Sequence, residues 1–463
     1  MLSLSTGRGT TFTELCGQYL SIRQTLQRLG VGPGSCVVSL VGNRPQFFSV
    51  FVACLDVGAL LLPLGEATDA EAVTLVRETG AVAVISDRAL PITPVEEARV
   101  DDDVRVTRVA DRPGWAPQGR SLVMKLTSGS TALPKAALAS EQILIGEGQR
   151  LTGAMGIGPG DITLTVIPLS HAYALGNVVM PLVLQGTAAA IRTAFSPSQF
   201  VRDALTSQAT VFPGVPFMFE RLRGLISTDG FPPGVRLLIT AGARVDVGTL
   251  RWFRDRANRK IHSLYGTSET GGITYDDTEE VADPLHVGRP LPDMAVEIRR
   301  EPDTTGVGRI FVRGPGVGLG YAQTDGADSP AAFQDGGFLT GDLGYLNSDG
   351  HLVLTGRVSP LINVAGRKVD PAEVERVLVG LPGVTDARVL GVSCDRRDQE
   401  LVAFVVGANP PLAPIAIRQL CANTLSPYKI PRRFVFLERW PVDARGKMDR
   451  QALEALATTD RGA

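Results

Sequence analysis

Apolar strand-like runs and helix-patterned segments alternate from the start of the chain, and this alternation limits what the chain can fold into. "FTELCGQYLSIRQTLQRLG" has helical spacing and ends at Gly30, and "RPQFFSVFVACLDVG" is a second helical segment. "SCVVSLVG", "GALLLPL" and "GAVAVISD" are short apolar runs typical of buried strands. The same alternation returns in "ITLTVIPL", "ATVFPGVP" and "VRLLITAG". The pattern predicts an α/β fold in which helices cover the sheets.

The pattern changes near Gly308 and again after Arg357. "GRIFVRGPG", "GFLTGDLGYLNSDG" and "HLVLTGR" are short strands separated by turns, which predicts an antiparallel β part. A helix in "VDPAEVERVLVG" and paired strands in "ARVLGVSC" and "ELVAFVVG" then predict a compact α+β unit. We predict a large N-terminal domain over residues 1–356, a hinge at 357–360 and a smaller C-terminal domain over 361–463.

Composition excludes several classes of protein. The net charge is -2, with no block of like charge, which argues against a nucleic-acid partner. The longest apolar stretch is broken by Asp56 and Gly58, so no membrane span is expected, and the N-terminus lacks the apolar run of a secretory signal. Five scattered cysteines predict buried, reduced thiols. We expect a cytoplasmic monomer or homodimer.

"TSGSTALPK", residues 127–135, has the composition of a phosphate-binding loop. Only six of the 46 basic residues are lysine, so Lys135 in this context is less likely to be a routine surface charge. Backbone N–H groups, hydroxyls and one ammonium could hold a polyphosphate. It is not a Walker A loop, because Ala136 follows Lys135. Taken alone, the motif leaves open a Ser/Thr-rich surface loop.

Three further motifs carry candidate chemistry. Glu269 in "SLYGTSETGG" is, taken alone, more typical of a solvated loop acid, but paired with a phosphate loop it could hold Mg2+ against phosphate oxygens. Asp342 lies between glycines in "FLTGDLGYL", where a carboxylate could accept from two vicinal hydroxyls such as those of a ribose. Lys447 lies on a glycine turn in "PVDARGKMDR". "GPGVGLGY", residues 314–321, precedes no helix pattern, so it is interpreted as a structural turn and not as a dinucleotide site.

In this order the four motifs resemble those of the AMP-forming adenylating superfamily: acyl- and aryl-CoA synthetases, adenylation domains of peptide synthetases, and luciferases. "PLSHAYALG", "ITAGA", "HVGRPLP" and "SPYKIP" are also similar to family signatures, and the resemblance extends from "TFTEL" to "GKMDR". It implies a mobile C-terminal domain and two half-reactions: formation of an acyl-AMP from ATP, and transfer of the acyl group to a thiol.

The resemblance also implies roles for individual residues. Tyr265 would lie against the adenine, Asp342 would bind the ribose, Glu269 would hold Mg2+, and Lys447 would bridge the acid and the α-phosphate. The full set that would bind ATP is Thr127, Ser128, Gly129, Ser130, Thr131, Lys135, Gly242, Ala243, Arg244, Tyr265, Gly266, Ser268, Asp342 and Arg357.

The acid and the thiol are less defined. His171 resembles the gate residue of acyl- and aryl-CoA synthetases, whereas amino-acid-activating relatives place an aspartate where this chain has Ala172. No Asp or Glu occurs between Asp161 and Asp203, so an α-ammonium substrate is disfavoured. An aryl or a short-to-medium acyl acid is expected, in a pocket walled by Tyr173, Val215, Gly242, Gly271 and Gly272.

The acceptor is expected to be coenzyme A, with Gly366 lining the thiol tunnel. A stand-alone adenylation enzyme that loads a carrier-protein phosphopantetheine stays open as an alternative. A degenerate nucleotide-binding protein is a second alternative, because Ala132 and Ala136 replace family glycines. Pro360 occupies the hinge position where the family usually has a polar residue.

Overall fold

The computed structural model describes most of the chain, in ranges that we give once: 1–65, 67–110, 121–126, 136–225, 230–279, 284–300, 306–322, 332–357, 362–364, 367–369, 371–394, 398–407, 413–423, 425, 429–442 and 448–459. Two compact units are present. Unit 1 contains Met1–Thr340 and Gly344–Leu354, and unit 2 contains Gly341–Leu343 and Thr355–Ala463. Of the expected hinge only Arg357 is described, so the hinge stays a prediction.

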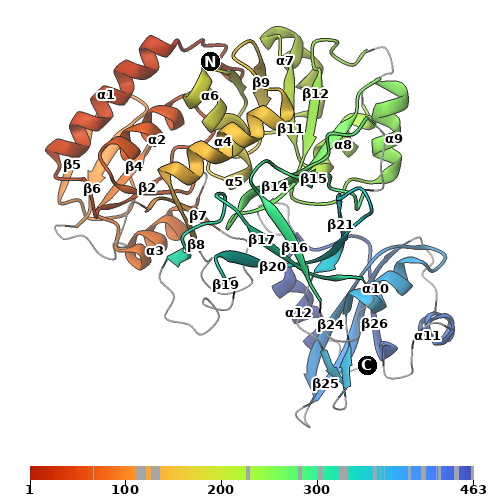
Figure 1. Cartoon of the computed structure of the whole chain (residues 1–463). Coiled ribbons are helices and arrows are strands. Elements are labelled where there is room, and N and C mark those ends of the chain that lie inside the picture. Colours follow the sequence, from red (N-terminus) through yellow and green to blue (C-terminus); the bar gives the residue numbers. More distant parts are fainter. Residues whose placement is uncertain are drawn as a thin grey trace. The chain divides into compact units, whose positions relative to one another are not determined.

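The first sheet of unit 1 is built from the alternation at the start of the sequence (Figure 1). Its strand order is β18-β8-β7-β3-β2-β4-β6-β5, with β3, β2 and β4 parallel. The bounds are β2 (Cys36–Ser39), β3 (Leu60–Pro63), β4 (Ala83–Ser86), β5 (Glu96–Arg99), β6 (Arg105–Arg108), β7 (Ser121–Leu126), β8 (Ala136–Ser140) and β18 (Tyr321–Ala322). Every residue of β2, β3 and β4 is buried, as expected for strands covered on both faces.

The second sheet has the order β1-β10-β9-β11-β12-β13-β14-β15 and is parallel from β1 to β13. The bounds are β1 (Leu2–Ser3), β9 (Ile162–Thr165), β10 (Ala188–Ile191), β11 (Val211–Gly214), β12 (Leu237–Thr240), β13 (Ile261–Thr267), β14 (Gly271–Tyr275) and β15 (Arg289–Pro290). Nine α-helices are described in unit 1: α1 (Phe12–Arg28), α2 (Gln46–Asp56), α3 (Asp69–Thr79), α4 (Glu141–Met155), α5 (Ala172–Ala174), α6 (Met180–Gln185), α7 (Phe200–Ser207), α8 (Pro216–Arg223) and α9 (Val247–Arg256).

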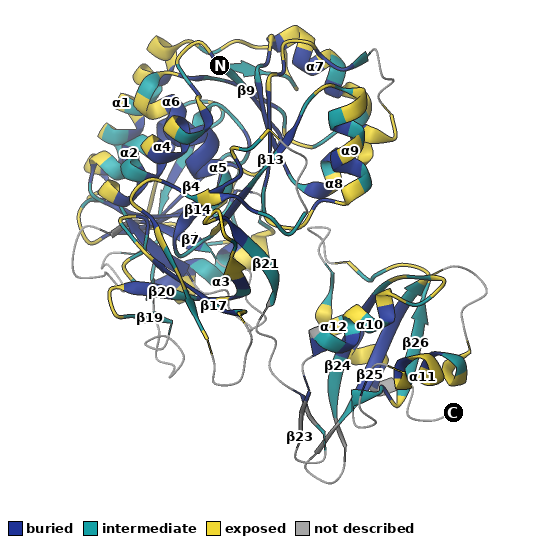
Figure 2. Ribbon diagram, turned by 45° about the vertical axis from the view of Figure 1, so that its right-hand side comes forward, coloured by how far each residue is buried: buried dark blue, intermediate teal, exposed yellow. Residues whose placement is uncertain are grey.

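Local sequence signals account for the helix boundaries. Thr11 and Thr68 each form a capping box with a glutamate three residues later, at the starts of α1 and α3. The helices then bury one face: Ile22 and Leu26 of α1 join Phe51 of α2 in the largest apolar cluster. Figure 2 shows the sheets as mostly buried and the outer faces of the helices as exposed.

The antiparallel part comprises β16 (Ala295–Arg299), β17 (Gly308–Arg313), β19 (Phe333–Gln334), β20 (Gly337–Leu346) and β21 (Leu352–Arg357). Strands β16 and β17, and β19 and β20, pair antiparallel as the sequence predicts. Strand β18 departs from the expected antiparallel part. It follows the turn at 314–320, which opens no helix, and pairs with β8 of the first sheet.

Unit 2 contains the expected α+β arrangement. Its three-stranded sheet is β24 (Val384–Cys394), β25 (Asp398–Gly407) and β26 (Arg433–Leu437), and a hairpin joins β22 (Ile362–Val364) to β23 (Arg367–Val369). Its described helices are α10 (Pro371–Val379), α11 (Pro414–Ala422) and α12 (Arg450–Thr459). Val374, Leu378 and Phe404 are among its fully buried residues.

Three expectations from composition can be set beside the structure. Cys36, Cys54 and Cys421 are free and buried, and burial raises the pKa of Cys36 to about 11. Cys16 is exposed on α1, so the prediction of buried thiols is wrong for this residue.

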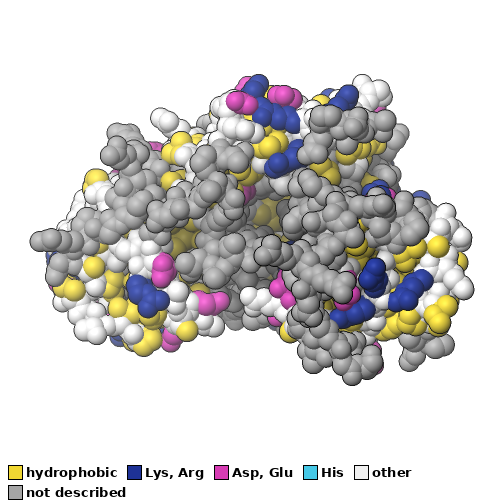
Figure 3. All heavy atoms as spheres, turned by 90° about the horizontal axis from the view of Figure 1, so that it is seen from below, with side chains coloured by type: hydrophobic (Ala, Val, Ile, Leu, Met, Phe, Trp, Pro, Cys, Tyr) yellow, Lys and Arg dark blue, Asp and Glu magenta, His cyan; other side chains and the backbone are white. Residues whose placement is uncertain are grey.

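On the face in Figure 3, described acidic and basic side chains occur close to one another. None of the helices in the described part of the chain is both long and apolar enough to cross a membrane.

Gly288 provides a test of the packing between β14 and the turn that leads into β15. Its φ is +80°, and a Cβ there would lie 2.0 Å from the Tyr275 carbonyl oxygen. Gly350 is a matched control, because its φ is +77° and a Cβ would meet nothing within 4 Å. We expect Gly350→Ala to cost about 1–2 kcal/mol, the cost of a left-handed backbone alone. Gly288→Ala should cost clearly more, measured by thermal unfolding, and equal losses would contradict this packing.

Candidate active site

Several predicted site residues lie at one edge of the parallel sheet. Val215 follows β11, Gly242 follows β12, and Tyr265 is near the end of β13. These three strands are parallel neighbours, so their carboxyl ends meet at the same edge. Ligands of open parallel sheets bind outside this edge. The structure therefore brings together the predicted adenine segments and one predicted pocket wall.

The predicted phosphate loop, residues 127–135, connects two paired strands of the first sheet. Leu126, the last residue of β7, pairs with Ala136, the first residue of β8. Helix α4 begins only at Glu141, after β8, so no helix follows the loop directly. Residues 127–135 lie outside the described part of the chain, and the roles of Thr127, Ser128, Gly129, Ser130, Thr131 and Lys135 stay predictions, as does the effect of Ala132.

We call the strands on either side of this loop its stems: β7, which ends at Leu126, is the first, and β8, which begins at Ala136, is the second. The Glu269 motif is joined to the first stem. Ser268 Oγ donates a hydrogen bond to the Leu126 carbonyl at 3.0 Å. This bond uses the single hydroxyl proton, so Ser268 would have to exchange it to donate to a phosphate oxygen. The backbone of Glu269, the next residue, is therefore held close to the stem of the predicted phosphate loop.

Glu269 has the chemistry of a magnesium ligand. It is partly exposed, and its Oε1 accepts from the Tyr321 hydroxyl at 2.7 Å. Mg2+ is commonly bound through one or two carboxylates together with phosphate oxygens, and Glu269 supplies one such carboxylate beside the loop expected to hold phosphate. Within the described ranges, no cluster of three or more His, Cys, Asp or Glu residues could hold a metal by itself.

The predicted adenine site is formed by a buried ring and an exposed turn. Tyr265 is 8% exposed and belongs to an apolar cluster with Leu264 and Tyr275. Gly242, Ala243 and Arg244 are exposed, and Gly242 has φ +86°, which favours glycine. The turn has the exposure that an adenine contact requires, whereas most of the Tyr265 ring is covered by protein.

The predicted acid-binding segment begins an irregular helix. His171 is exposed at the N-terminus of α5, and a π-helical turn over Leu175–Val179 joins α5 to α6. π-helical turns are frequent at functional sites. Tyr173 donates its hydroxyl to the Ile239 carbonyl of β12 at 3.1 Å, and burial raises its pKa well above the ordinary value. His171 is thus exposed two residues before a tyrosine that is fixed on the sheet, and its gate role stays a prediction.

The predicted glycine wall of the acid pocket faces α4. A Cβ at Gly271 would lie 2.5 Å from the Glu147 carboxylate, and one at Gly272 would lie 3.0 Å from Leu151. A Cβ at Gly176, in the π-helical turn, would meet both of these α4 side chains, Leu151 at 2.7 Å and Glu147 at 3.0 Å. Glu147 and Leu151 therefore fill the space that the glycines leave, so the glycines do not deepen the pocket toward α4.

Glu147 forms a buried ion pair that sequence analysis missed. Lys125 Nζ of β7 lies 2.8 Å from Glu147 Oε2, and the two side chains are 2% and 5% exposed. Breaking a buried pair by removing one partner typically costs about 3–5 kcal/mol. A lysine inside the apolar run "SLVMKL" was the available signal, because a strand interior rarely holds an unpaired charge.

The remaining predicted residues belong to unit 2. Asp342 is buried on β20 at 6% exposure, and Arg357 is the last residue of the neighbouring strand β21. Val442 and Met448 form an antiparallel bridge on either side of the segment that contains Lys447. Lys447, Pro360 and Gly366 lie outside the described residues, and their roles stay predictions.

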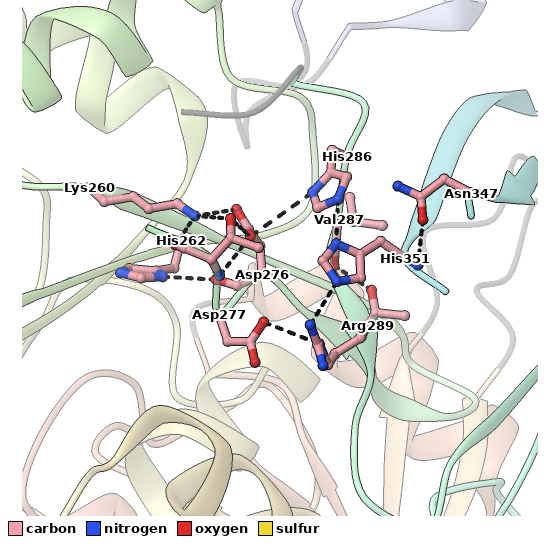
Figure 4. Close-up of polar contacts among 11 residues, drawn as sticks. Lys260, His262, Asp276, Asp277, His286, Val287, Arg289, Asn347 and His351 are labelled. Carbon is pink, nitrogen blue, oxygen red and sulfur yellow. Dashed lines mark hydrogen bonds and ion pairs between the residues drawn. The ribbon is translucent and has the colours of Figure 1, made fainter. Parts of the chain in front are cut away.

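A polar network lies at the opposite end of β13 and β14 (Figure 4). Arg289 donates to His351 Nε2 at 3.0 Å, so His351 carries its proton on Nδ1 and donates to His286 Nε2 at 2.7 Å. His286 therefore carries its proton on Nδ1, 4.0 Å from an Asp276 oxygen. Asp276 also pairs with buried Lys260 at 2.8 Å. The network joins β14 to the turn that precedes β21.

Family models match nearly the whole length of the chain. The model of the AMP-binding enzyme family matches residues 2–322, and that of the AMP-binding enzyme C-terminal domain matches residues 373–447. The 2-succinylbenzoate–CoA ligase of Geobacillus kaustophilus is 29% identical, over 98% of this chain and 95% of the relative. A feruloyl-CoA synthase of an Amycolatopsis species is 28% identical, over 96% and 93%.

Solved structures support the fold. ATP-bound MatB from Rhodopseudomonas palustris has a TM-score of 0.79 at 21% identity, covering 98% of this chain and 94% of that chain. The o-succinylbenzoate CoA synthetase of Bacillus subtilis, in complex with an acyl-adenylate intermediate, has a TM-score of 0.76 at 24% identity, covering 97% and 94%. The mixed α/β fold with a large N-terminal part and a smaller C-terminal part is confirmed.

His262 should make stability depend on pH. Its Nδ1 lies 2.8 Å from the Asp276 carbonyl, which only accepts, so Nδ1 carries a proton. Burial lowers the pKa of His262 below the ordinary value near 6.5, at which it titrates in the unfolded chain. The unfolded state therefore binds more protons as the pH falls below about 6.5, and stability decreases there.

We expect the contribution of His262 to thermal stability to stay constant between about pH 7 and 8. Below about pH 6.5 this contribution should decrease. The difference in thermal stability between the wild type and His262→Gln, measured at each pH, isolates this contribution, because both proteins contain the other histidines. The wild type should lose more stability on acidification than the variant. Parallel stability curves for the two proteins would refute the assignment.

Proposed function

We propose, from the premise that the chain belongs to the AMP-binding enzyme family, that it activates a carboxylic acid with ATP and transfers the acyl group to coenzyme A. The hydrogen bond from Ser268 to Leu126 carries the proposal, because it holds the Glu269 motif against the stem of the phosphate loop. CoA ligases among the relatives support the same chemistry. We assign the chain to the AMP-forming acid–thiol ligases.

The first half-reaction joins two anions. A carboxylate oxygen attacks the α-phosphorus of ATP, a P–O bond forms, and pyrophosphate leaves with the electrons of the broken bond. Lys447 would neutralise the charge that builds between the acid and the α-phosphate, and Glu269 would hold the Mg2+ that shields the phosphates. In the second half-reaction a thiol adds to the acyl carbonyl, loses its proton, and releases AMP as the thioester forms.

The acid is proposed to be an aryl or short-to-medium acyl acid without an α-ammonium group. Glu147 and Leu151 fill the space beside the glycine wall, which supports a compact acid over a long chain directed toward α4. Glu147 is the carboxylate that sequence analysis overlooked near this wall, but it is paired with Lys125 at 2.8 Å. It therefore offers little counter-charge for an ammonium group.

Coenzyme A is the proposed acceptor, and Gly366 is proposed to line its thiol tunnel. A carrier-protein phosphopantetheine presents the same thiol, so a stand-alone adenylation enzyme is the second candidate. Pyrophosphate release should be measured with a panel of aryl, acyl and amino acids, with free coenzyme A or a phosphopantetheinylated carrier protein. Thioester formation only on the carrier would select the second candidate, and absence of pyrophosphate release with every acid would favour a nucleotide-binding protein without catalysis.

Lys447→Ala should reduce acyl-adenylate formation by at least about 100-fold, because one positive charge is lost where negative charge builds. Thermal stability should change little. Arg439→Ala is the control, since Arg439 is an exposed cation of the same unit. Pyrophosphate release at the wild-type rate by Lys447→Ala would show that another group supplies this charge.

Pro360→Asp tests the proposed hinge. Proline fixes φ near -65°, which leaves ψ and neighbouring residues to carry a rotation. We expect the variant to form acyl-adenylate at the wild-type rate and to form thioester at an equal or higher rate. If adenylation is lost while thiol transfer from supplied acyl-adenylate persists, the proline instead holds the chain in the adenylating orientation.

A further inference from the structure

Tyr321 joins the Glu269 motif to the second stem of the phosphate loop. It follows the glycine-rich turn at 314–320 and begins β18, where it pairs with Ala137 of β8. The backbone just before Tyr321 is fixed as well, because Leu138 donates to the Gly320 carbonyl and Leu319 donates to the Leu138 carbonyl, both at 2.9 Å. The ring is therefore carried by a strand paired to the one that starts directly after the loop.

The hydroxyl of Tyr321 is aimed at Glu269. It donates to Glu269 Oε1 at 2.7 Å, and the Glu269 carbonyl accepts from the Gly318 N–H at 2.7 Å. The phenol is the donor in this bond, because an ionised carboxylate oxygen can only accept. Edge-on packing against Phe333, with ring centroids 5.2 Å apart, limits where the Tyr321 ring can go.

The two stems of the loop are thus tied by different bonds to two consecutive residues, Ser268 and Glu269. Ser268 holds the β7 stem through Leu126, and Tyr321, carried beside the β8 stem, holds the side chain of Glu269. A glutamate side chain has three rotatable bonds, and its terminal torsion is broad. The hydrogen bond to Oε1 removes much of the rotational freedom of the Glu269 side chain. It leaves Oε2 as the carboxylate oxygen that does not accept this hydrogen bond.

We propose that Tyr321 is a positioning residue for the magnesium of the adenylation reaction: its hydroxyl fixes Glu269 Oε1 so that Oε2 is presented to an ion on the ATP phosphates. This inference rests on the proposed function for the role of Glu269. Mg2+ tolerates little departure from octahedral geometry, so the direction of a single protein carboxylate affects affinity. Partners that orient a ligand in this way typically account for about 10- to 100-fold in metal affinity.

Tyr321→Phe removes only the hydroxyl and keeps the ring beside Phe333. Tyr19→Phe is the matched control, because Tyr19 also donates to a carboxylate, that of Asp56, at 2.7 Å, but on α1. ATP binding is measured by titration calorimetry across a Mg2+ series, without any acid, and pyrophosphate release is measured across the same series with an acid from the panel. Thermal unfolding of each variant reports any structural loss.

We expect Tyr321→Phe to need about 10- to 100-fold more Mg2+ for half-maximal ATP binding and for half-maximal rate, with the rate recovering at saturating Mg2+. Tyr19→Phe should follow the wild-type Mg2+ curve. An unchanged Mg2+ requirement in Tyr321→Phe, or wild-type ATP binding that does not depend on Mg2+, would overturn the inference. A rate lost equally at all Mg2+ concentrations would assign Tyr321 a general structural role and also overturn it.

Failure of the proposed function is distinguishable from failure of this inference. If the wild type binds ATP in a Mg2+-dependent way but activates no acid, the proposed reaction fails. The calorimetric comparison of wild type with Tyr321→Phe still decides the role of the hydroxyl.

Discussion

The pairing of the two-residue strand β18 with β8 is the constraint on which the candidate site depends. It connects a turn near the start of the antiparallel part to the strand that directly follows the phosphate loop, across almost two hundred residues of sequence. The register places Ala322 opposite Ala136 and Tyr321 opposite Ala137. Because Gly318 of the same turn donates to the Glu269 carbonyl, one short segment aligns a strand of the first sheet with a motif of the second. Strand β8 of the first sheet and the turn between β13 and β14 of the second sheet are thereby held at the same candidate site.

Three of the six lysines form ion pairs within the described parts of the chain. In the described parts of the chain, Lys125, Lys260 and Lys429 each contact a carboxylate within 2.8 Å. Lys125 and Lys260 are buried, so the desolvation of both charges in each pair offsets much of their attraction. We therefore expect these pairs to favour one packing arrangement of the chain more than they add to its net stability. Two of these pairs join a lysine to a helix, since Glu147 is on α4 and Glu373 is on α10. The scarcity of lysine was visible in the sequence, but it was interpreted only as a sign of phosphate binding.

Much of the fold follows from local patterns. The alternation up to β4 and the strands β9, β11 and β12 were predicted because each buries a continuous apolar run, and this signal does not depend on distant residues. Strand β18 was not predicted, because two residues after a glycine-rich turn have no periodicity and their partner is far away in sequence. Glu147 was missed for a related reason: its partner Lys125 is on another element, and a helix pattern treats a glutamate as solvated. Glu269 was found only through the order of motifs, since a single acid in a loop is most often a surface residue.

The geometry of the stems bears on the departure at Ala136. A family glycine replaced by alanine affects the loop itself only if that position requires a left-handed backbone. Ala136 does not lie in such a position, because it is the first residue of β8, is 8% exposed and pairs with Leu126 and Ala322. A small buried side chain in a paired strand is compatible with the sheet. The bonds that align the site therefore come from the stems and from Ser268 and Tyr321, and replacement of the glycine at 136 leaves all of them in place. This argues for a functional phosphate site over a degenerate one.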